Sequence, residues 1–76
     1  MQEVLYGRNP VYECLRAGRR QVARLVVAEG GRKGGTLAEA VTLARRRGVP
    51  VQRADRQQLD RLAKGARHQG VVAEVD

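Results

Sequence analysis

The stretch that decides the fold is Val22-Ala23-Arg24-Leu25-Val26-Val27-Ala28-Glu29. Its run from Leu25 to Ala28 is continuously apolar, which is typical of a strand covered on both faces. An alternating pattern would indicate a strand with one face in water instead. We therefore expect residues 22–29 to form the central strand of a sheet that has helices packed on both sides.

Helical patterns flank this strand. Before it, Asn9 is expected to cap a helix with Pro10 at its first position, and Gly18 to end that helix in the left-handed conformation. After it, residues 36–39 (Thr-Leu-Ala-Glu) have the spacing of a capping box, and Gly48 is expected to end the second helix. The strand therefore lies between two helices in the sequence.

A third helix is expected from Asp55, with Gln58 completing its cap, to a stop at Gly65. The expected strands, in chain order, cover residues 4–6, 22–29, 49–54 and 71–75. Strands that alternate with helices of this length predict an α/β fold with three layers (α/β/α) around a mostly parallel four-stranded sheet. With 76 residues, positions 1–76 make a single domain.

The composition favours a polyanionic partner. The chain has 15 basic and 8 acidic residues, a net charge of +7, which favours RNA or DNA ahead of a membrane surface. Tyr6 and Tyr12 are the only aromatic residues besides the single histidine, so a platform that stacks several bases is not expected. A lone Cys14, with neither a signal peptide nor a spanning segment, predicts a cytoplasmic domain without disulfides, metal or membrane partner.

No set of residues suited to catalysis can be recognised. His68 has no evident carboxylate partner nearby in the sequence, and no Ser/His/Asp grouping occurs. Arg45-Arg46-Arg47 sit in the last turn of an expected helix, where they complement the helix dipole, so they are not taken as a binding motif. We expect no catalytic residue in this chain.

Two turns and one loop are the candidate binding elements. Arg8 and Asn9 stand at the exposed start of a helix, and Arg67-His68-Gln69 precede the last strand; these two turns are expected to lie side by side. Asn9 serves as scaffold or contact. Arg32 and Lys33 precede a helix N-terminus and are expected to clamp phosphate, although a mobile loop kept soluble by its charge explains them equally well.

The segments Tyr6 to Val11, Leu25 to Ala28 and His68 to Val75 together resemble the N-terminal substrate-binding domain of the SpoU (TrmH-like) family of RNA 2′-O-ribose methyltransferases. The resemblance implies a fold similar to that of the eukaryotic-type ribosomal proteins that bind kink-turn RNA. Pro10 departs from the glutamate usual in those proteins, which speaks against kink-turn binding itself.

The resemblance also implies a function. This chain would recognise structured RNA, most readily ribosomal RNA, for ribose 2′-O-methylation. Methyl transfer from S-adenosylmethionine would belong to a knotted catalytic domain absent from residues 1–76, through which the parent enzyme would form a homodimer. No cofactor is then expected in this chain. Two alternatives stay open: a freestanding ribosomal or kink-turn RNA-binding protein, and a spacer whose basic charge is incidental.

Overall fold

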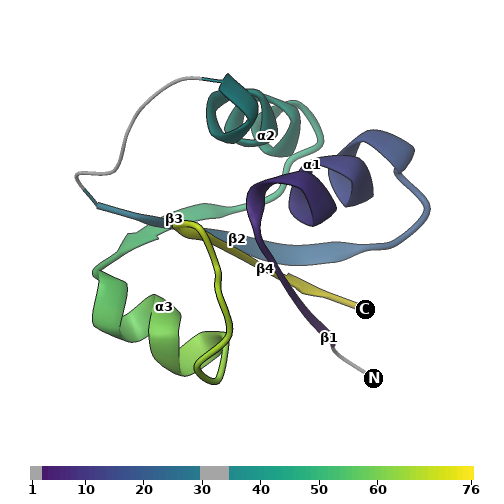
Figure 1. Ribbon diagram of the computed structural model, residues 1–76. Coiled ribbons are helices and arrows are strands. Elements are labelled where there is room, and N and C mark those ends of the chain that lie inside the picture. Colours follow the sequence, from purple (N-terminus) through teal and green to yellow (C-terminus); the bar gives the residue numbers. More distant parts are fainter. Residues whose placement is uncertain (1–2, 30–34) are drawn as a thin grey trace.

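Four strands form one sheet in the order β1-β4-β2-β3 in the computed structural model, which describes residues 3–29 and 35–76 (Figure 1). The strands are β1 (Glu3–Tyr6), β2 (Val22–Ala28), β3 (Val51–Ala54) and β4 (Val71–Val75), and the helices are α1 (Arg8–Ala17), α2 (Gly35–Arg46) and α3 (Arg56–Leu62). Helices α1 and α2 cover one face of the sheet and α3 covers the other (Figure 1). The expected three-layer α/β/α arrangement is confirmed.

The sheet is mixed, so the expectation of a mostly parallel sheet is wrong. Only β2 and β3 pair in parallel, whereas β4 runs antiparallel to both β1 and β2 between them. Strand β4 is therefore a second central strand beside β2. Alternating strands and helices predict a parallel sheet only if every helix returns the chain to the end of the sheet at which the preceding strand began. Helix α3 does not do so.

The short helix α3 explains the difference. Its seven residues span only about 10 Å. The chain then passes through residues 63–70 and comes back to the end where β2 finishes, as the hydrogen bond from Ala28 N to Gly70 O shows (2.9 Å). Because β4 starts at the end where β2 stops, the two strands must run in opposite directions.

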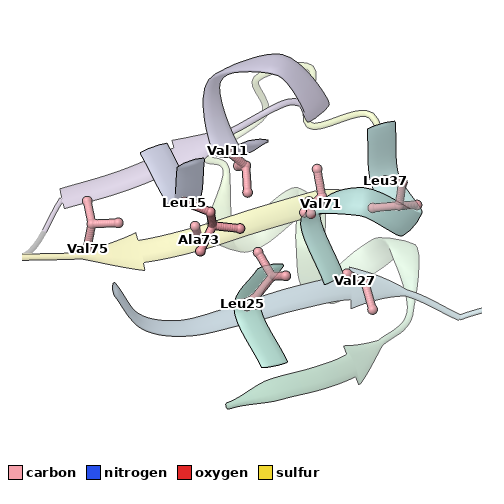
Figure 2. Packing of buried hydrophobic residues seen from close by; sticks show 10 residues of the cluster. Val11, Leu15, Leu25, Val27, Leu37, Val71, Ala73 and Val75 are labelled. Atoms are coloured by element: carbon pink, nitrogen blue, oxygen red, sulfur yellow. The ribbon is translucent and has the colours of Figure 1, made fainter. Parts of the chain in front are cut away.

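The larger core lies between the sheet and the helices α1 and α2 (Figure 2). Leu25 and Val27 of β2 and Val71 and Ala73 of β4 pack against Val11 and Leu15 of α1 and Leu37, Ala40 and Ala44 of α2. On the other face, Val26 and Val72 pack against Leu59 and Ala63 in a smaller cluster. Neighbours in β2 thus point into different cores, which explains its continuous apolar run.

The expected helix boundaries agree with the structure at Gly18 and Asp55, whereas α3 ends at Leu62, before the expected stop at Gly65. Gly18 ends α1 at φ 65°, donating its N–H to Cys14 O, and Asp55 caps α3 in a capping box with Gln58. Helix α2 already includes Gly35, so Thr36 lies within its first turn and the expected capping box at residues 36–39 is wrong. No helix in the described part of the chain is long and apolar enough to cross a membrane.

Candidate nucleic-acid interface

The two candidate turns are joined by backbone hydrogen bonds. Gly7 N lies 3.1 Å from His68 O and 3.2 Å from Val71 O. These bonds extend the antiparallel pairing of β1 with β4, in which Tyr6 faces Val72. The turns at residues 7–9 and 67–69 therefore lie side by side at one edge of the sheet, as expected.

Gln69 caps helix α1 from the neighbouring turn. The helix begins at Arg8, whose backbone N–H donates to Gln69 Oε1 at 3.0 Å, and Arg8 Nε donates to Gln69 O at 3.3 Å. The expectation that Asn9 caps this helix is therefore wrong, since Asn9 is its second residue. The N-cap position is occupied by Gly7, which has no side chain, and the capping oxygen is supplied by a residue 61 positions away.

The turn before β4 has a constrained backbone. Gln69 has φ 54° and Gly70 has φ 84°, so both residues are left-handed. That conformation costs a residue with a Cβ atom about 1–2 kcal/mol, and here the cap on α1 and the bond from Arg8 hold Gln69 in it. Constrained residues of this kind concentrate at functional sites, where the surrounding structure over-determines them.

His68 supports this turn from beneath. The residue is 6% exposed, its Nδ1 accepts the backbone N–H of Gly70 at 2.9 Å, and its Nε2 lies 2.6 Å from Asp60 Oδ1. An Nδ1 atom that accepts carries no proton, so Nε2 carries the proton and donates to the carboxylate. The structure thus places His68 below the surface with both ring nitrogens engaged. Sequence reasoning missed Asp60 because it lies eight residues upstream, on α3.

The polar groups left at the surface are mainly cationic. Arg67, Asn9 and Gln69 are exposed, and Arg8 is half-buried. An open hollow between this turn and α3 is lined by Arg56, Asp60, Gly65, Ala66, Arg67, His68 and Gln69. Arg8 and Arg67 form no salt bridge within the described residues, where the arginine salt bridges are those of Arg16, Arg20 and Arg24. The Arg67 guanidinium and the two terminal nitrogens of the Arg8 guanidinium are therefore available to a ligand.

Two further observations complete the site. Arg32 and Lys33 lie outside the described residues, and the described chain stops before them at Glu29, directly after β2. Tyr6, which sequence reasoning did not include among the site residues, is 42% exposed at the end of β1, beside the joined turns. Its signal in the sequence was its place immediately before Gly7-Arg8-Asn9.

Nothing in the described residues marks a metal or cofactor site. No group of three or more His, Cys, Asp or Glu residues in this part of the chain is placed to hold a metal ion. Every buried side-chain nitrogen or oxygen described has a hydrogen-bond partner, so no orphaned polar atom points to a cradle for S-adenosylmethionine.

Comparison with known proteins identifies a family that matches this sequence. Residues 4–76 match the family described as RNA 2′-O ribose methyltransferase substrate binding. The chain is 42% and 44% identical, over 73 residues, to proteins of Mycolicibacterium vanbaalenii and Mycolicibacterium gilvum that are both named uncharacterized tRNA/rRNA methyltransferase. It is 43% identical over 75 residues to the human mitochondrial rRNA methyltransferase 1.

These matches cover 96% of this chain in each case, but only 23% of each mycobacterial relative and 21% of the human one. The chain therefore corresponds to less than a quarter of the length of these relatives. The family match, by contrast, extends over nearly the whole chain and includes both joined turns. The protein belongs to the family of RNA 2′-O ribose methyltransferase substrate-binding domains.

Proposed function

We propose that this chain recognises a structured RNA and presents it for ribose 2′-O-methylation by a catalytic domain of the same protein. The observation that carries the proposal is the junction of the two turns, which places Arg8 and Arg67 at one edge of the sheet without carboxylate partners among the described residues. Guanidinium groups that no carboxylate engages suit phosphate contacts, which supply most of the affinity for nucleic acids.

The side chains divide into contacts and supports. Arg8, Arg67 and Gln69 contact the RNA, and Asn9 contributes from the first turn of α1. His68 positions Gln69 and Gly70 from below and does not touch the RNA, because both its ring nitrogens are engaged. Arg32 and Lys33, which lie in sequence just after β2, act as phosphate clamps.

The parent protein follows from the family and the names of the relatives. Two relatives are named as tRNA/rRNA methyltransferases and one as an rRNA methyltransferase, which supports ribosomal RNA as the substrate class. S-adenosylmethionine would supply the methyl group in the catalytic domain, through which the parent enzyme would dimerise. The lone Cys14 favours a reducing compartment, and we assign the protein to the cytoplasm.

The alternative of a freestanding ribosomal or kink-turn RNA-binding protein is less well supported. The relatives that match are named methyltransferases and extend well beyond the matched region. Pro10 lies in the first turn of α1, where it removes a backbone donor next to the candidate contacts.

A salt titration tests the proposal. Binding of a ribosomal RNA fragment is measured at several salt concentrations for the wild type, Arg8→Ala and Arg46→Ala. Each phosphate contact contributes about −0.7 to −0.9 to the log–log slope, so Arg8→Ala should weaken binding and flatten the slope by about one contact. Arg46→Ala removes the same charge from the far end of α2 and should leave the slope nearly unchanged.

Two results would contradict the proposal. Binding that does not depend on salt would show that the RNA makes no phosphate contacts with this domain. Equal losses of RNA affinity in the two variants would mean that overall charge, not the joined turns, attracts the RNA. Circular dichroism of each variant verifies that the comparison is made between folded proteins.

A further inference from the structure

Tyr6 is the one large hydrophobic side chain that is exposed among the described residues, at 42%. It ends β1, an edge strand of the sheet, so no further strand covers its open side. Its neighbour Leu5 packs against the core of α1 and α2, and side chains alternate along a strand, so Tyr6 lies on the face that carries α3. The hollow lined by Arg67 and Gln69 opens beside that helix.

The hydrogen bonds of the joined turns determine which polar groups remain for a ligand. Arg8 uses its backbone N–H and its Nε atom on Gln69, which leaves its two terminal guanidinium nitrogens. Gln69 uses Oε1 to cap α1, which leaves its NH₂ group as the exposed donor. These donors belong to Arg8, two residues after Tyr6, and to Gln69 in the turn that is hydrogen-bonded to Gly7 through His68 O.

We propose that Tyr6, Arg8 and Gln69 form a binding site for one unpaired guanine of the RNA. The guanine ring stacks on Tyr6, and its O6 and N7 atoms accept hydrogen bonds from the Arg8 guanidinium and the Gln69 amide. This inference rests on the proposed function and adds to it the class of RNA element that is recognised.

Guanine complements these donors better than adenine does. Guanine presents two acceptors, O6 and N7, on the same edge, whereas adenine presents an acceptor and a donor there. A glutamine reads adenine with both its oxygen and its NH₂ group, but the oxygen of Gln69 is already engaged with Arg8.

The shape of RNA favours an unpaired base at this site. In an A-form duplex this edge of guanine lies in a deep, narrow major groove that side chains do not enter. Tyr6 also needs an open base face to stack on.

Tyrosine emission tests the proposal directly. The chain has no tryptophan, so a Tyr12→Phe background leaves Tyr6 as the single tyrosine fluorophore. It is titrated with a short RNA hairpin carrying one bulged guanosine, with the same hairpin carrying a bulged adenosine, and with the fully paired hairpin. Emission should be quenched by the bulged guanosine hairpin and change little with the paired one.

Affinities measured with the same RNAs complete the test. Tyr6→Leu should bind the bulged guanosine hairpin roughly tenfold more weakly or worse, as expected for the loss of one stacked base, and Tyr6→Phe should restore binding because it keeps the ring face. Circular dichroism verifies that both variants are folded, and the emission titration needs no variant at Tyr6.

The outcomes separate this inference from the proposed function. Salt-dependent binding that is equal for all three hairpins, or that Tyr6→Leu leaves unchanged, would overturn the guanine site while leaving RNA recognition intact. Equal quenching by bulged guanosine and bulged adenosine would likewise overturn it. Absence of salt-dependent binding to any of these RNAs would count against the proposed function itself.

Discussion

The two ends of the sheet hold their arginines in different ways. At the recognition end, formed by residues 7–9 and 67–70, Arg8 and Arg67 have no carboxylate partner among the described residues. At the opposite end, formed by residues 18–20 and 45–48, Arg20 bonds to Glu3 and to the backbone oxygen of Asp76, and Arg47 bonds to Arg16 O. Arg20 and Arg47 at the opposite end thus serve the fold.

The helix termini explain this contrast. Helices α1 and α2 both finish at the opposite end, where unpaired carbonyl oxygens attract Arg47 and the cations in the last turns. Helix α1 begins at the recognition end, where Gln69 Oε1 accepts the backbone N–H of Arg8 and Gly7 O accepts that of Val11. A basic residue at the start of a helix gains nothing from the dipole. Arg8 supports the neighbouring turn through its Nε bond to Gln69 O, and its two terminal nitrogens remain for a ligand.

The largest effect on stability is expected for His68→Ala. The substitution leaves the N–H of the buried Gly70 without an acceptor, and an unsatisfied buried donor costs about 1–3 kcal/mol. Urea unfolding measures the loss. Because the turn that carries Gln69 is no longer supported, RNA affinity should fall together with stability.

Two matched variants sharpen this result. Asp60→Asn keeps an oxygen that can accept from Nε2, and its site is exposed, so it should cost less than His68→Ala. Arg47→Ala, at the opposite end, should lower stability by less than about 1 kcal/mol and leave RNA binding unchanged. If Arg47→Ala reduced binding as strongly as His68→Ala, the functional distinction between the two ends would be lost.

A smaller effect is expected at Gln69, where two substitutions separate the cap from the backbone strain. Gln69→Ala loses the cap on α1 and keeps the left-handed backbone, which should cost about 1 kcal/mol. Gln69→Gly loses the same cap but relieves the strain, so thermal unfolding should show it to be the more stable of the two. Equal stabilities would mean that the left-handed backbone at Gln69 is not strained.

The sequence predicts features that depend on residues close together in the chain, and it does not predict features that depend on contacts between separate elements. The stop at Gly18, the cap at Asp55 and the buried strand at residues 22–28 depend on neighbours in the chain, and their patterns indicate them correctly. The direction of β4 depends on where α3 delivers the chain, which no local pattern encodes.

The candidate site divides in the same way. The structure confirms the expectation that the two turns adjoin, although the expected mostly parallel sheet would have placed the end of β1 and the start of β4 at opposite ends. The partnership of His68 with Asp60 and the cap that Gln69 places on α1 could not be inferred from the sequence, since both are side-chain contacts between separate elements. A glycine at the N-cap is the local sign that the capping group comes from elsewhere.

The smallest effect is expected for Asn9→Ala, and it tests whether Gln69 caps α1. If Asn9 were the N-cap, its loss would cost about 1 kcal/mol, as Asp55→Ala should at the start of α3. Since Asn9 is exposed in the first turn and Arg8 is already capped, Asn9→Ala should change the free energy of unfolding by less than about 0.5 kcal/mol. Urea unfolding of both variants under one set of conditions makes the comparison. A loss of stability for Asn9→Ala as large as that for Asp55→Ala would mean that Asn9 itself caps α1. A loss of RNA affinity without a loss of stability would place Asn9 among the RNA contacts.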